Sequence, residues 1–90
     1  MITLDMVKEW LRLDHDDFDG LVEDLLDSAK RICADILRLE NAEELEVTPL
    51  TKIAILYAMA YLFEHREDPD LNALKTNLRS LLESDRKAAF

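Results

Sequence analysis

The sequence predicts an all-α fold, a small bundle of about four helices. Glycine occurs once and proline twice among 90 residues, which leaves little material for turns and much for continuous helices. Apolar residues make up 49% of the chain, and in most segments they recur at intervals of three and four residues, the period of one helix face. We expect residues 1–90 to form one helical domain, since one domain is ordinary for this length.

Residues 4 to about 11 are predicted to form the first helix. Thr3 precedes them and is a good N-cap, and Asp5 lies where the helix dipole favours negative charge. We expect Trp10 to anchor the core, as large aromatic side chains commonly do. One apolar face is formed by Leu4, Val7, Trp10 and Leu11.

A second, longer helix is predicted from the acidic segment 14–19, which offers several N-caps, to about Leu39. A subset of its apolar residues also fits a heptad seam, so a coiled coil is the alternative to ordinary packing, which the width of the stripe favours. The apolar residues at helical spacing are Phe18, Leu21, Val22, Leu25, Leu26, Ala29, Ile32, Cys33, Ile36 and Leu37.

The third predicted helix begins at Thr48-Pro49, a cap followed by a proline at the first helical position, and continues to about His65. The acidic residues before it, 40–46, lack a clear apolar period and are interpreted as a linker or an extension of the second helix. From Ile53 to Phe63 the helix is apolar on nearly every side, as expected for a central helix, and we place Leu56 in the core. A chain of this size buries about 60 to 65% of its unfolded surface. We therefore expect another subunit to complete the burial of this helix.

The segment 66–70 breaks the pattern, and a fourth helix is predicted from Leu71 to near Asp85. We expect residues 86–90 to form a frayed tail. The apolar positions of the fourth helix are Leu71, Leu74, Leu78, Leu81 and Leu82.

The sequence predicts no catalytic site, no metal site and no cofactor. His15, beside aspartates, and His65 lack a second histidine or cysteine at ligand spacing. An EF-hand loop with Gly20 at its sixth position has His15 first and Leu26 twelfth, which are the wrong ligand types. A helical metal-dependent enzyme is thus a weak alternative. The single cysteine, Cys33, has no partner within the chain, which fits a reducing compartment.

The net charge of −9 is unevenly distributed. Residues 1–47 hold 14 acidic and 5 basic side chains, whereas residues 48–90 hold 6 of each. This composition argues against a basic groove that grips nucleic acid directly. The longest apolar run has 11 residues, short of the roughly 20 that a membrane span needs, and the acidic amino terminus is unlike a signal peptide. Candidate partner-binding residues, whose alternative role is a solvated acidic face, are Asp16, Asp17, Asp19, Glu23 and Asp27.

Several blocks of residues, spread over most of the chain, form a recognisable pattern. They are Met1-Ile2-Thr3-Leu4-Asp5, Val7-Lys8, Trp10-Leu11-Arg12-Leu13-Asp14-His15-Asp16-Asp17, Pro49-Leu50, Ala54-Ile55-Leu56, Ala60, Leu62, Glu64, Arg66-Glu67, Leu78, Leu81, Leu82 and Arg86. Together these blocks resemble a known family, the small helical head-tail connector proteins of long-tailed bacteriophages, also called head-completion or DNA-packaging adaptor proteins. The chain differs from the usual pattern in the charged segment 40–46 and at Ser84-Asp85, where family members tend to carry an aromatic residue.

The resemblance implies a structural protein that forms a closed ring of about a dozen subunits with heterologous contacts. The ring would dock beneath the portal protein, present a surface for a tail-side connector or stopper protein, and let DNA pass through its channel. No membrane is expected among its partners. It would lie at the head-tail junction of the virion, and in the host cytoplasm during assembly, encoded by a phage or prophage. The rival interpretation is a small acidic regulatory protein that sequesters a basic partner.

Overall fold

The computed structural model describes residues 2–12 and 19–88, and the side chains of residues 2–12 and 19–83. Four α-helices and one short 3-10 helix occur in these residues, and no strand, so the predicted all-α class is confirmed. In chain order they are α1 (Leu4–Leu11), α2 (Asp19–Ile36), η1 (Ala42–Glu44), α3 (Pro49–Glu64) and α4 (Leu71–Ala88).

Two predicted helix starts are confirmed by their caps. The hydroxyl oxygen of Thr3 accepts a hydrogen bond from the backbone N–H of Met6 at 3.3 Å. The hydroxyl oxygen of Thr48 accepts one from the N–H of Thr51 at 3.0 Å, and Pro49 occupies the first helical position. Both side chains satisfy an N–H that has no partner within its helix.

The second helix ends earlier than its apolar period predicts. It stops at Ile36 instead of Leu39, because Arg38 adopts the left-handed conformation with φ of 60°. The N–H of Leu39 then donates to the carbonyl of Ala34 at 2.8 Å, which closes the helix end. The apolar side chains of this turn still pack against the core, and this is why the period continues after the helix has ended.

The acidic segment after α2 is folded against the core, and is neither a plain linker nor an extension of α2. The side-chain oxygen of Asn41 accepts from the N–H of Glu43 at 3.0 Å and caps η1. Leu45, which follows η1, is 1% exposed. At the other end of the chain, α4 runs to Ala88, three residues beyond the predicted end at Asp85.

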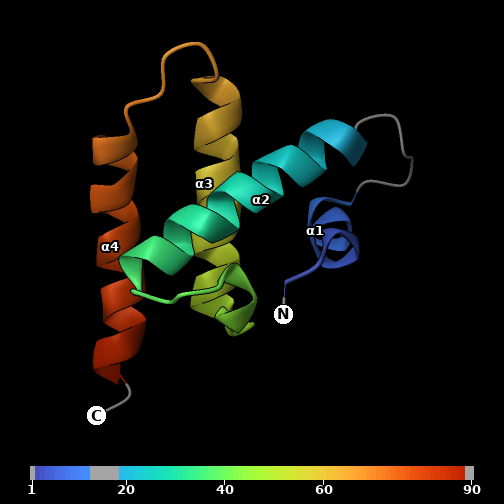
Figure 1. The fold of residues 1–90 in the computed structure, drawn as a ribbon. Coiled ribbons are helices and arrows are strands. Elements are labelled where there is room, and N and C mark those ends of the chain that lie inside the picture. The colour runs from blue at the N-terminus through green and yellow to red at the C-terminus, as the bar shows by residue number, and fades with distance from the viewer. Residues whose placement is uncertain (1, 13–18, 89–90) are drawn as a thin grey trace.

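Figure 1 shows α3 and α4 side by side, with α2 crossing α3 and α1 placed near the amino end of α2, away from α4. Trp10 is half-buried and packs against the core, as predicted. Leu56 is half-buried and was wrongly placed in the core; its neighbour Ile55 is fully buried. The core residues are Ile2, Val7, Val22, Leu26, Ala29, Cys33, Leu45, Ala54, Ile55, Ala58, Met59, Leu74, Leu78 and Leu82.

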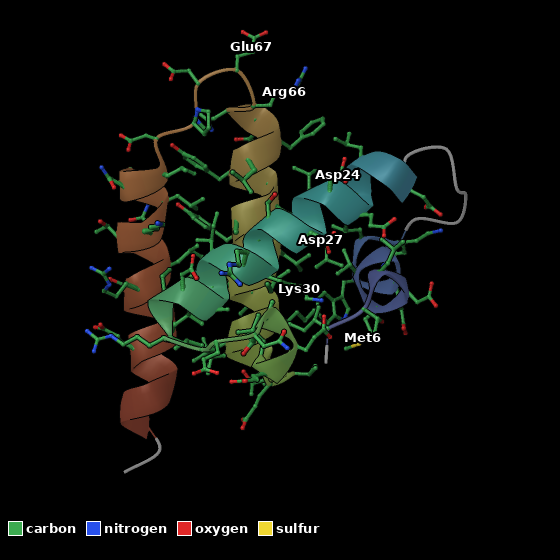
Figure 2. The ribbon with its side chains drawn as sticks, in the orientation of Figure 1. Met6, Asp24, Asp27, Lys30, Arg66 and Glu67 are labelled. Atoms are coloured by element: carbon green, nitrogen blue, oxygen red, sulfur yellow. The ribbon has the colours of Figure 1, made fainter. Side chains whose placement is uncertain are left out.

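A buried lysine joins three parts of the chain. Lys30 on α2 is 7% exposed, and its Nζ donates to the backbone carbonyl of Ile2 at 3.0 Å. The same nitrogen lies 3.4 Å from Oε1 of Glu43 on η1. Figure 2 shows Lys30 further along α2 from Asp24 and Asp27. Lys30 therefore fixes the amino-terminal segment and η1 to α2.

Candidate protein interaction surface

One side of α3 is apolar and uncovered. Ile53 is 51% exposed, Phe63 45% and Tyr57 40%, and the small Ala60 between them is also exposed. At 100° per residue these four side chains fall within a sector of about 120° around the helix. We call them the α3 stripe. Large apolar side chains gathered on one helix face are typical of a surface that another protein covers.

The α3 stripe continues toward α1 and α2. A hollow of about 190 Å³ lies between the three helices, and every described side chain that lines it is apolar. Leu11, at the end of α1, is 44% exposed beside it. The lining residues are Leu11, Val22, Leu25, Leu56, Met59, Ala60 and Phe63.

A second and wider hollow lies on another side of α3, where α2 meets the turn between α3 and α4. Its volume is about 540 Å³. Leu71 in its wall is 43% exposed, while Leu62 and Ile32 are half-buried. We call this the α2 hollow. It is lined by Asp27, Ser28, Arg31, Ile32, Leu62, Pro69 and Leu71.

The predicted partner-binding aspartates and glutamate are only partly brought together. Asp16 and Asp17 lie outside the described residues. Asp19 forms an ion pair with Lys8 of α1, with 2.9 Å between Oδ1 and Nζ, so it holds α1 against α2. Glu23 and Asp27 are exposed on α2 and form no ion pair with a described residue.

Asp27 is the predicted acidic residue that also borders an apolar hollow. Asp24 precedes it by three residues, is exposed, and also forms no ion pair with a described residue. The nearby Arg31 is directed along α2 toward Asp35, with 3.6 Å between Nε and Oδ1. Figure 2 shows Asp24 and Asp27 on α2 and Arg66 and Glu67 at the turn that joins α3 to α4. The α2 hollow thus combines apolar walls with an unneutralised carboxylate.

Cations lie at both ends of the α3 stripe. Lys52 precedes Ile53, and its Nζ is 5.5 Å from the ring centre of Trp10. Arg66 lies over the ring of Phe63 at 5.1 Å and donates a hydrogen bond to the carbonyl of the same residue at 3.0 Å. Neither cation forms an ion pair with a described carboxylate. Aromatic rings therefore hold two positive charges beside the stripe.

The two candidate reactive residues that the structure describes, His65 and Cys33, have structural roles. His65 caps the end of α3, where its ring stacks on Tyr61 at 4.2 Å and its Nδ1 lies 3.1 Å from the Tyr61 carbonyl. Burial raises the pKa of the Cys33 thiol to about 12, which keeps the sulfur neutral. His15 lies outside the described residues. Within residues 2–12 and 19–83, no three histidine, cysteine or acidic side chains are grouped as a metal site would require.

The chain matches the model of a protein family. The model of the phage gp6-like head-tail connector protein matches residues 1–84. The chain belongs to this family. The match covers α1, α2 and α3 and all of α4 except its last turn, so the predicted resemblance to head-tail connectors is confirmed. No curated protein and no solved structure matches the chain.

Membership in the connector family makes the chain a structural component of a phage virion that assembles with other virion proteins. The family is a structural one and not a known class of enzyme. None of the described helices of this connector combines the length and the apolar character that a membrane span requires.

Sequence reasoning on this connector missed two features of its surface. It found the apolar excess of α3, but not which side of the helix is uncovered, because nearly all sides are apolar in sequence. It also missed the α2 hollow, which joins residues 27–32 of α2 to Leu62 of α3 and Leu71 of α4, 30 or more positions later in the chain. The helical register of α4 shows Leu71 at its first position, yet no pattern in the sequence places that leucine opposite α2.

Proposed function

We propose that this chain, as one connector domain of residues 1–90, is a ring-forming structural adaptor between the portal and a tail-side connector or stopper protein. The ring has about a dozen subunits, and each subunit joins two neighbours through different faces. DNA passes through the channel during packaging and ejection. The family match over residues 1–84 is the observation that carries the proposal.

The α3 stripe is the surface that the proposed ring buries. A side chain such as Ile53, half exposed in the single chain, gains roughly 25 cal/mol for every Å² of apolar surface that a neighbour removes from water. The carboxylates of α2 and the phosphates of DNA repel one another, which suits a conduit that DNA slides through better than a clamp. The adaptor needs no chemistry of its own, and we propose that it is not an enzyme.

The proposed site of action is the head-tail junction, with assembly in the cytoplasm of the bacterial host from a phage or prophage gene. In this position the exposed carboxylates of Glu23 and Asp27 contact a basic surface of a neighbouring protein. Asp16 and Asp17, of the same predicted acidic set, contribute to that contact.

Mixing the purified chain with the portal protein tests the adaptor role. We expect co-sedimentation and, by electron microscopy, a ring stacked on the portal. The α3 variant Ile53→Asp should bind less and form fewer rings, whereas Val47→Asp, a change at a similarly exposed residue outside the stripe, should behave as wild type. A chain that remains monomeric with the portal present, and does not co-sediment, would oppose the adaptor role and favour a small acidic regulator.

A further inference from the structure

We infer that the α3 stripe of one subunit docks into the α2 hollow of the next copy of the same chain. This inference rests on the proposed ring and names the two faces that meet in it. The occupant of the hollow is thus a second copy, presenting Ile53, Tyr57 and the adjoining Lys52.

The α3 stripe and the α2 hollow lie on different sides of α3. Leu62, which lines the α2 hollow, lies about 180° around the helix from Ile53 and about 140° from Tyr57 at 100° per residue. The stripe and the hollow therefore face opposite ways. A stripe that enters a neighbour's hollow leaves the first subunit's own hollow open for a third copy. This is the head-to-tail kind of contact from which rings are built when the rotation between copies closes.

The α3 stripe and the α2 hollow match each other in shape and polarity. The α3 stripe is a convex ridge of one helix with two aromatic rings, and the α2 hollow is a concavity of about 540 Å³ with apolar walls. A volume of several hundred Å³ is enough for large side chains to enter. Both surfaces contain large apolar side chains that remain 40% or more exposed in the single chain, namely Ile53, Tyr57 and Phe63 on the stripe and Leu71 in the hollow.

The two surfaces also carry unpaired charges of opposite sign. The wall that α2 contributes to the hollow carries Asp27, which has no ion pair with a described residue, and Arg31, whose Nε lies 3.6 Å from Oδ1 of Asp35. This helix belongs to the half of the chain that carries the whole negative excess. Lys52, at the amino end of the stripe, also lacks a carboxylate partner among the described residues. Docking brings unpaired charges of opposite sign to one interface. Two stripes placed against each other would instead bring the cations Lys52 and Arg66 of both copies to one interface, and like charges disfavour such a wrong pairing.

Two blocking variants test the contact. Ile53→Asp damages the stripe and leaves the hollow intact, while Leu71→Asp damages the hollow and leaves the stripe intact. Both residues are exposed, so folding should be preserved, and Val47→Asp serves as the matched control. Assembly is measured by light scattering across concentration, with and without the portal, at up to about a hundred times the concentration at which wild type is half assembled.

We expect each blocking variant to lose ring formation, and an equimolar mixture of the two to form a one-to-one pair, since one intact stripe then meets one intact hollow. The charge variants Asp27→Lys and Lys52→Asp should each raise the concentration needed for assembly by about tenfold or more, and the double variant should recover most of the loss.

The inference is overturned if Leu71→Asp assembles as wild type, if the mixture gives no pair, or if the double charge variant assembles no better than the single ones. In each of these cases wild-type rings would still support the adaptor role. Wild type that forms no ring, alone or with the portal, removes the proposed function and this contact together.

Discussion

Lys30 donates a hydrogen bond from its Nζ to the backbone carbonyl oxygen of Ile2, 28 residues away, at 3.0 Å. The lysine is 7% exposed and Ile2 is 1% exposed, so this polar contact lies within the packed interior. A buried carbonyl without a partner is costly, and the bond therefore holds the amino-terminal segment in place. Its second partner, Glu43, connects η1 to the same side of α2, where the buried Leu45 also packs.

Replacing this lysine should destabilise the fold. Lys30→Met keeps most of the aliphatic stem but leaves the Ile2 carbonyl unpaired, and we expect it to lower the free energy of unfolding by about 1 to 3 kcal/mol in a urea titration. The control is Arg31→Met, which removes an exposed ion pair between residues four apart on α2 and should cost no more than about 0.5 kcal/mol. Equal losses in the two variants would contradict the role given to the Lys30 contact.

The cap of α3 gives a second prediction. Thr48 accepts from the N–H of Thr51, and the two hydroxyl oxygens lie 2.8 Å apart. Thr48→Ala should lower stability by about 1 to 2 kcal/mol, because it removes the cap and a partner of the buried Thr51 hydroxyl. Thr48→Ser retains both bonds and should lose much less, as measured by thermal unfolding. If the serine variant is as unstable as the alanine variant, the hydroxyl is not what stabilises the helix start.

Adjacent isoleucines on α3 should respond differently to substitution. Ile55 is 0% exposed, and Ile55→Ala should lower the free energy of unfolding by about 2 to 5 kcal/mol through lost burial and a cavity. Ile53 is 51% exposed, and Ile53→Asp should change the free energy of unfolding by no more than about 0.5 kcal/mol. The same substitution should weaken assembly. Chemical denaturation of the single chain at low concentration separates the two effects. Similar folding losses at both positions would exclude a surface reserved for subunit contact.

Because Cys33 is buried, we expect the free energy of unfolding to depend on pH in the alkaline range. Burial raises its pKa from the ordinary 9.0 to about 12, so above pH 9 the unfolded chain loses a proton that the folded chain retains. The unfolded state then binds fewer protons, and stability falls as pH rises from about 9 to 12 by up to about 1.4 kcal/mol per pH unit. Cys33→Ala should remove this share of the pH dependence when its unfolding is compared with wild type over that range. If the free energy of unfolding of Cys33→Ala falls with pH as steeply as that of wild type, the prediction is wrong. Rapid chemical labelling of the Cys33 thiol in the native protein at pH 8 would also contradict it.

Local signals in the sequence predicted the helix starts well. Thr3 and Thr48-Pro49 act within one helical turn, and the caps and the first position depend on neighbours in sequence. The end of α2 was predicted three residues too late because an apolar period reports which residues face the core and not the backbone conformation of Arg38. Long-range contacts explain the other errors. The acidic segment 40–46, interpreted as a linker or an extension of the second helix, contains the buried Leu45, and its Glu43 contacts the buried Lys30 of α2.

The interaction surface could be predicted only in part. Net charge placed the acidic excess in the first half, and Glu23 and Asp27 are indeed exposed on α2. Asp19 belongs to the same acidic run but is paired with Lys8, because α1 lies beside the amino end of α2. A pattern of charges along one helix shows its faces, whereas the residues that neutralise them come from another helix.

Native mass spectrometry of the wild-type chain, alone over a range of concentrations and then with the portal protein, tests the adaptor proposal most directly. The chain has a mass of 10.4 kDa, so each added subunit is resolved. We predict a closed species of about a dozen copies, formed with the portal if not without it, and few species of intermediate size, since a closed ring satisfies every contact. A 10.4 kDa monomer under both conditions, with no complex that contains the portal, would contradict the account.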